Sequence, residues 1–217
     1  MHFIFRISLA VLLSLPLFAK ENNPYPKPTG FICGQSTITF SYLGQTVIYG
    51  TVESNGRCWL DRNLGAQQVA NHSQDESAYG DLFQWGRKSD GHQLKNANST
   101  EKLLVTNENS STDFITTPET SQWGNWSTNQ NNKQWNSRHV NNPCPYGWRI
   151  PTAQEWNKEK NNWTENNGRG AIQSNLLLPL PGIRDLNDAT IQQAGHLGFY
   201  WTSDTVNKLS SIFVITS

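Results

Sequence analysis

The histidines of this chain are the first candidates for acid–base or metal chemistry, and they are scattered along the sequence. His72, His92, His139 and His196 form no HxxxH pair, and none has the spacing from a cysteine that is typical of a zinc site. No glycine-rich phosphate loop is present either. The spacing of these residues therefore indicates neither a metal centre nor a phosphate-binding site.

Carboxylates are the next candidates for catalysis. Hydrolysis of a glycosidic bond needs two facing carboxylates, and Asp61, Glu155 and Asp185 are available. Glu155, however, lies three residues after Thr152, which is the spacing of a helix capping box. Asp61 precedes Arg62, and no second acid or nucleophile accompanies that charged pair. We therefore expect a non-enzymatic protein.

Oxygen donors gather in the run Asp185-Leu186-Asn187-Asp188, which could collect a calcium ion. Calcium takes roughly six to eight oxygen ligands, and the donors of this run fall short of that number. We expect a solvated turn here and no resident cofactor, with calcium as the alternative.

Tryptophans are the candidate ligand-binding residues. Trp123, Trp126 and Trp135 lie between residues 88 and 142, a polar stretch that we expect to be mostly surface loop. An indole in such a loop either pins the loop to the body of the protein or presents a face on which a ligand stacks. Both alternatives are open, and these three residues are the first to mutate if the protein binds saccharide.

A capped helix is the central element that must position these groups. Thr152 and Glu155 predict a helix from about Ala153 to Trp163, and Trp156 lies on the same helical face as Trp163. Alternating residues, turn signals and runs of aromatic and β-branched residues predict the other elements. These are a hairpin over Ser36–Val52 turning at Gly44-Gln45, a strand over Arg57–Leu60, a short helix over Glu76–Trp85, a turn over 166–170, and strands over Gly198–Ser203 and Ser211–Ile215. We expect Trp59, Trp85, Trp148, Trp156 and Trp201 to be structural residues, together with Thr152 and Glu155.

The cysteines indicate one disulfide bond and one odd thiol. Cys33 precedes the predicted hairpin and Cys58 lies in the following strand, so the two can close a loop of about 25 residues. Cys144 is then left over, and an unpaired thiol in an exported protein needs an explanation.

Composition and the first residues bear on class and location. The chain has 217 residues, 35% apolar residues, nine tryptophans and a formal net charge of zero. A neutral balance removes the electrostatic basis for binding nucleic acid or an anionic membrane. Residues 1–19 read as a signal peptide, so we expect a secreted, periplasmic or cell-surface protein with no membrane insertion after cleavage. Residues 20–32 read as a polar, proline-rich linker.

Five sequence runs resemble those of a known family, in the expected order along residues 33–217. The runs are NGRCWLDRNLG (55–65), YGDLFQWGR (79–87), CPYGWRIPTAQEW (144–156), LPLPGIR (178–184) and GFYWTS (198–203). They are similar to the signature of the Fibrobacter succinogenes major paralogous domain family. The resemblance implies an α+β fold, a variant of the C-type lectin-like fold with short antiparallel sheets, two or so helices and long irregular loops. This fold is shared with formylglycine-generating enzymes and with bacterial and phage receptor-binding proteins.

The resemblance also offers an account of Cys144. Relatives usually finish with a strand of the form Gly-x-Ser-Val-Arg-Cys, and this chain stops at Ser217 before such a strand. We therefore expect that the C-terminal strand is missing and that Cys144 is unpaired by truncation. The alternative is a genuine free or intermolecular thiol.

The function that follows from export, resemblance and polar loops is recognition. We expect an attachment module at the bacterial cell envelope that binds an extracellular saccharide or a cell-surface protein through its long loops. Two alternatives remain, an envelope enzyme similar to formylglycine-generating enzymes and a structural envelope protein.

Overall fold

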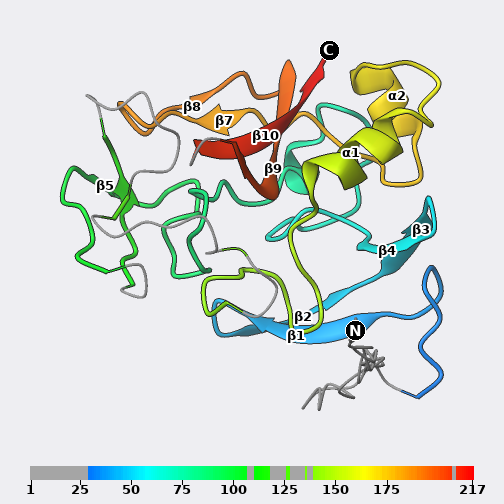
Figure 1. The fold of residues 1–217 in the computed structure, drawn as a ribbon, viewed down its shortest axis with the longest axis horizontal. Helices are drawn as coiled ribbons and strands as arrows, with labels where there is room; N and C mark the ends of the chain where they lie inside the picture. Colours follow the sequence, from blue (N-terminus) through cyan, green and yellow to red (C-terminus); the bar gives the residue numbers. More distant parts are fainter. Residues whose placement is uncertain (1–28, 107–109, 118–125, 128–134, 136–138, 207–208) are drawn as a thin grey trace, which may run out of the picture.

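The computed structural model describes residues 29–106, 110–117, 126–127, 135, 139–206 and 209–217 as a mixed α/β protein with few helices and short sheets (Figure 1). The predicted signal peptide and all but the last four residues of the predicted linker lie outside these ranges. In chain order the elements are β1 (Ile38–Tyr42), β2 (Gln45–Tyr49), β3 (Thr51–Ser54), β4 (Arg57–Leu60), the 3₁₀ turn η1 (Glu76–Ala78), β5 (Ser99–Thr100), β6 (Phe114–Ile115), α1 (Ala153–Lys160), α2 (Gly168–Gln173), β7 (Ile183–Arg184), β8 (Ile191–Gln192), β9 (Leu197–Val206) and β10 (Leu209–Thr216). This architecture is compatible with the α+β class that the resemblance implies.

The described strands pair in twos, and most pairs are antiparallel. β1 pairs with β2, β3 with β4, β7 with β8 and β9 with β10, whereas β5 and β6 run parallel. In Figure 1 the β1–β2 hairpin lies along the bottom of the molecule and β9–β10 near its top, with α1 between β9–β10 and the β3–β4 pair. The fold is therefore an assembly of small two-stranded ribbons, with α1 packed against the β9–β10 ribbon.

The predicted second strand of the hairpin is interrupted at Gly50, which separates β2 from β3. The Gly50 amide donates to the Asp61 carboxylate over 2.9 Å, and its carbonyl accepts from the Asp61 amide over 3.1 Å. A Cβ at this position would lie 2.5 Å from the Asp61 Oδ2 atom, so the close approach requires glycine. The bend starts a new pairing, β3 with β4, which alternation alone did not indicate.

Helix α1 begins as predicted. The Thr152 hydroxyl accepts from the Glu155 amide over 3.2 Å, and the Glu155 carboxylate accepts from the Thr152 amide over 2.8 Å. The capping box is confirmed. The helix ends at Lys160, before the predicted Trp163, because Asn161 to Trp163 continue as a turn.

Residues 166–170, predicted as a turn, instead lead into α2, and that prediction was wrong. The Asn167 side chain accepts hydrogen bonds from the amides of Arg169 and Gly170 over 3.0 and 3.2 Å. This is an N-cap, which stabilises a helix start even where two glycines lower its intrinsic propensity. Ala171 is fully buried, so packing against the rest of the protein also stabilises this helix.

The core centres on Trp156. Its indole stacks on Phe213 with ring centroids 5.2 Å apart and packs against Trp59 at 5.1 Å and Tyr200 at 5.5 Å. Its ring N–H donates to the Trp201 carbonyl over 3.1 Å. The buried cluster around it consists of Ala171, Leu176, Leu178, Leu180, Tyr200, Phe213 and Ile215. Large rings from α1, β9 and β10 thus supply the volume that a chain with few aliphatic residues needs.

The predicted helix over Glu76–Trp85 was wrong, since only the 3₁₀ turn Glu76–Ala78 forms. Gly80 has a φ of +72°, a left-handed conformation that ends the turn. Beyond it, backbone amides donate to distant groups: Leu82 to the Gln93 carbonyl over 3.0 Å and Gln84 to the His92 ring over 3.0 Å. These tertiary bonds replace the local i to i−4 bonds that a helix would need.

Parts of the stretch 88–142 are buried, whereas the sequence predicts mostly surface loop. Among its described residues, Phe114, Ile115, His92 and Gln93 are fully buried. The Gln84 side chain donates to the Ile115 carbonyl over 2.8 Å and accepts from the Ile115 amide over 2.9 Å. A polar sequence can therefore be buried here because its amide and imidazole groups find hydrogen-bond partners.

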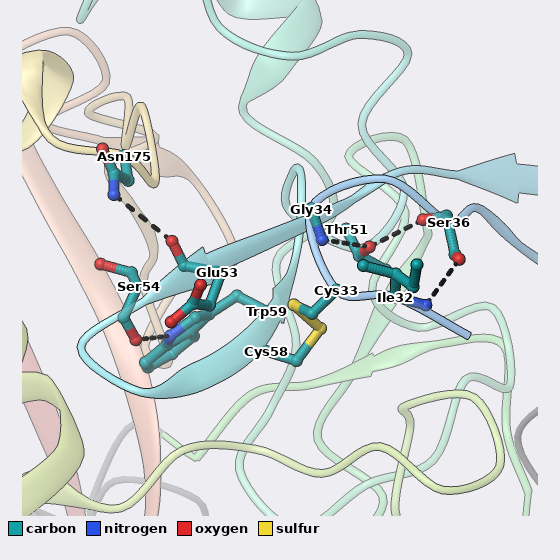
Figure 2. The surroundings of a disulfide bond; sticks show 10 residues. All are labelled: Ile32, Cys33, Gly34, Ser36, Thr51, Glu53, Ser54, Cys58, Trp59 and Asn175. Atoms are coloured by element: carbon teal, nitrogen blue, oxygen red, sulfur yellow. Dashed lines mark hydrogen bonds between the residues drawn. A yellow bond between two sulfur atoms is a disulfide. The ribbon is translucent and has the colours of Figure 1, made fainter. Parts of the chain in front are cut away.

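The disulfide bond between Cys33 and Cys58 is confirmed, with Cα atoms 5.7 Å apart (Figure 2). It ties the segment before β1 to β4. The same segment is held by the Thr51 hydroxyl, which accepts from the Gly34 amide over 3.0 Å and donates to the Ser36 carbonyl over 2.7 Å. Closing this loop contributes roughly 3.5 kcal/mol on the chain-entropy model.

Candidate ligand-binding cavity

A cavity of about 250 Å³ opens between β4, β9, β10 and the segment that leads into α1. Its wall is largely aromatic and apolar. We call it the aromatic cavity and define it by the six half-buried side chains Trp59, Phe83, Trp148, Phe199, Trp201 and Ile212. Half-buried rings around a hollow are the usual lining of a small-molecule site.

Strand alternation positions one side of the cavity. Phe199 and Trp201 are two residues apart on β9 and therefore share one face, whereas Tyr200 between them is buried in the core. Ile212 is the cross-strand partner of Trp201 on β10. The ribbon β9–β10 therefore supplies Phe199, Trp201 and Ile212 to the cavity, and the buried Tyr200 also reaches its wall.

The segment before α1 positions Trp148. Its amide donates to the Pro145 carbonyl over 2.9 Å, and its carbonyl accepts from the Asn142 side chain over 2.8 Å. Trp148 is thus held by a turn and not by a regular element.

Indole N–H groups at the cavity are directed into the protein. Trp201 donates to the Phe83 carbonyl over 2.7 Å, Trp59 to the Ser54 carbonyl over 3.4 Å, and Trp135 to the Arg87 carbonyl over 3.0 Å. The half-buried Trp59 and Trp201 rings consequently offer a ligand their apolar faces, whereas Trp135 is almost fully buried.

Charged side chains of the wall are engaged as well. Arg62 bonds to its neighbour Asp61 over 2.9 Å, and Arg149 bonds to Glu155 over 2.9 Å. The Arg149 guanidinium lowers the pKa of Glu155 to about 2. Arg62 therefore has a carboxylate partner of its own, whereas Arg149 shares Glu155 with Arg57.

Two further charged groups in the wall are held by neutral partners. Asp81 accepts from the Tyr42 hydroxyl over 2.6 Å, and burial raises the pKa of this carboxyl. Arg184 donates to the carbonyls of Ala189, Leu94 and Ala97 over 2.9, 3.0 and 2.7 Å. Burial lowers the pKa of Arg184.

The candidate ligand-binding residues from the sequence do not present faces to solvent. Trp126 and Trp135 are each 1% exposed, and the Trp126 ring N–H donates to the Trp85 carbonyl over 2.7 Å. They pin the chain, so the stacking alternative was wrong for these two, although Trp135 also touches the cavity wall. Trp123 lies outside the described residues.

Three residues that line the cavity, Trp59, Trp148 and Trp201, are among those that the sequence predicts to be structural. The other three, Phe83, Phe199 and Ile212, are not among the candidate residues from the sequence. The run GFYWTS carried the signal: strict alternation on a strand with one buried face leaves Phe199 and Trp201 on the opposite face. Trp59 and Trp148 gave no such signal, because their exposure depends on where α1 and β9 lie. Trp85, in contrast, is a core residue as predicted, 2% exposed.

Cys144 lies in the cavity wall as a free thiol. Burial raises the pKa of this thiol to about 12, so it is protonated at neutral pH and a weak nucleophile. The other two cysteines of the chain form the disulfide bond. Cys144 is therefore the one cysteine of the given sequence that lies outside a disulfide bond.

The three carboxylates considered for glycoside hydrolysis are not brought together at the cavity. Asp61 bonds to Arg62 and to the Gly50 amide, and Glu155 bonds to Arg149 and Arg57. Asp185 accepts from the Asn187 amide over 2.7 Å within its own loop. Each carboxylate thus has a structural partner.

Within the described ranges no group of three or more histidine, cysteine, aspartate or glutamate side chains could hold a metal ion. In the loop considered for calcium, Asp188 accepts from the Thr190 amide over 2.9 Å and from its hydroxyl over 2.7 Å.

A second cluster of titratable groups is buried beside the cavity. Arg87 bonds to Asp90 over 3.1 Å, and His92 Nδ1 lies 2.6 Å from the other Asp90 oxygen. Because His92 Nε2 accepts from the Gln84 amide, its proton resides on Nδ1 and is donated to Asp90. Burial lowers the pKa of His92 to about 4, against the opposing effect of Asp90.

Acid is expected to weaken the fold through His92. The unfolded chain, with a histidine pKa near 6.5, binds this proton more tightly than the folded protein, so stability is full above pH 6.5 and is lost as pH falls toward 4. Between pH 7.5 and 5.0 the free energy of unfolding should fall by about 2 kcal/mol. Urea titrations at both pH values, with His92→Gln as the non-titrating control, check this. A control that loses as much stability as the wild type would contradict it.

Comparison with known proteins adds no assignment: no family model, no curated protein and no solved structure matches this chain. Within the described residues, the helices are too short and too polar to cross a bilayer.

Proposed function

We propose that this chain is an exported, non-enzymatic recognition module that holds part of its ligand in the aromatic cavity. The observation that carries the proposal is the hollow of about 250 Å³ walled by half-buried rings. Proteins rarely leave such rings unpacked without a binding role. Saccharide and cell-surface protein are the two ligand classes considered.

The family and location are part of the same proposal. A C-type lectin-like fold of the Fibrobacter succinogenes major paralogous type accounts for the five sequence runs and is compatible with short antiparallel ribbons around a capped helix. A disulfide bond supports a secreted, periplasmic or cell-surface location, because such bonds persist in oxidising compartments.

Binding to a glycan array and to whole bacterial and host cells tests this function. Trp148→Ala removes a ring of the cavity wall, whereas Tyr146→Ala removes an exposed ring two residues away that is not part of the wall. We expect wild-type protein and Tyr146→Ala to bind alike and Trp148→Ala to bind at least about tenfold more weakly, the effect of 1.4 kcal/mol. Wild-type protein that binds no surface would overturn the proposal and favour a structural envelope role. Binding unaffected by Trp148→Ala would place the ligand elsewhere.

A further inference from the structure

The hydrogen-bonding state of the cavity wall restricts which ligand chemistry it can accept. A polar group that leaves water must find a partner, or its burial is unfavourable. The ligands that the wall accepts therefore depend on which of its side-chain donors and acceptors remain available.

Most of the polar side chains of the wall already have partners. The Trp59, Trp135 and Trp201 ring N–H groups donate to backbone carbonyls. The two amide side chains of the wall are engaged likewise: Asn63 donates to the Tyr79 carbonyl over 3.1 Å, and Gln84 bonds to both backbone groups of Ile115. A hexose, whose hydroxyls all need partners, would find few here.

The charged side chains of the wall also have partners already. Arg62 pairs with Asp61, Arg149 shares Glu155 with Arg57, and Asp81 and Arg184 are bonded to a hydroxyl and to carbonyls. A charged ligand would have to displace one of these partners as well as lose its own hydration.

The volume of the cavity limits the size of the ligand. An apolar cavity of about 150 Å³ in an engineered protein stays dry and binds benzene. At about 250 Å³ the aromatic cavity has room for more than one such ring.

We infer that the aromatic cavity binds a small, neutral, apolar molecule, such as a fused two-ring aromatic or a short acyl chain, by contact with ring faces. This inference rests on the proposed function only in taking the cavity as the ligand site. It selects hydrophobic chemistry where the proposed function leaves saccharide and protein open.

The test is a titration of the full chain with the neutral fluorophore N-phenyl-1-naphthylamine. Ile212→Trp, and independently Ile183→Trp, add bulk at the wall, whereas Val206→Trp adds the same bulk at an exposed site, 61% exposed, at the end of β9. We expect saturable one-to-one binding to the wild type and to Val206→Trp, displaced by 1-octanol and not by glucose. Binding should be at least tenfold weaker in both filled variants. Circular dichroism and thermal melts identify a variant that has not folded, and the other then decides.

Several outcomes would overturn the inference: absence of saturable probe binding, equal affinity in a folded filled variant, or displacement by glucose. Failure of the proposed function is distinguishable. Probe binding with no attachment to arrays or cells would leave the cavity assignment standing and remove the recognition role. Trp148-dependent glycan binding without probe binding would leave the recognition role standing and remove the assignment of an apolar ligand to the cavity.

Discussion

Replacing Trp156 by alanine is expected to lower the free energy of unfolding by about 3–5 kcal/mol, the range for a buried tryptophan. The side chain is 5% exposed, stacks on Phe213, contacts Trp59 and Tyr200, and donates to the Trp201 carbonyl. Its removal leaves a cavity between α1 and β9–β10 and an acceptor without its donor. Urea unfolding followed by far-ultraviolet circular dichroism measures the loss.

Trp163→Ala is the matched control for that substitution. Trp163 meets the same Phe213 ring edge-on, with centroids 5.9 Å apart, but is only half-buried. Its loss should therefore be less than half that of Trp156→Ala. Equal losses would mean that Trp156 does not centre the core.

Removal of the Asp90 carboxylate is expected to cost about 3–5 kcal/mol, because it leaves a buried guanidinium without its counter-charge. Arg87 is 1% exposed, and its remaining partners are the Gln84 side chain and the carbonyls of Asp113 and Ser111. Asp90→Ala also deprives His92 of its acceptor. Thermal and urea unfolding measure the effect.

A double variant and a surface ion-pair variant serve as controls for the Asp90→Ala substitution. Arg87→Met combined with Asp90→Ala removes both charges, and the double variant should be more stable than the sum of the single losses predicts. Arg169→Ala breaks an exposed ion pair with Glu165 and should change stability by less than about 1 kcal/mol. A loss of that small size for Asp90→Ala would show that the buried pair contributes no more than a surface pair.

Local chemistry explains why some elements were predictable. The capping box of Thr152 and Glu155 acts within one turn, so spacing alone predicts the start of α1. The β1–β2 hairpin follows from alternation, and the strands β9 and β10 follow from runs of aromatic and β-branched residues; neither signal needs knowledge of distant residues. The Cys33–Cys58 bond joins neighbouring elements, and for this reason its pairing could be proposed from order along the chain.

Elements that depend on distant partners were mispredicted. The chain after η1 forms no helix because Leu82 and Gln84 bond to residues of the 92–93 segment. Trp126 and Trp135 are buried because their ring N–H groups reach the carbonyls of Trp85 and Arg87, more than forty positions earlier. No local pattern distinguishes such an indole from an exposed one.

The sequence by itself determined the capped helix, the main strands and the disulfide bond, since each rests on interactions within one element or between neighbouring elements of the chain. Only the tertiary structure decided where the candidate site lies. The aromatic cavity exists because β4, the 143–151 segment and β9–β10 meet around Trp156, and its apolar character arises because indole N–H groups bond to backbone carbonyls contributed by other segments. Burial and hydrogen-bond partnership are properties of that packing, and residue type alone does not specify them.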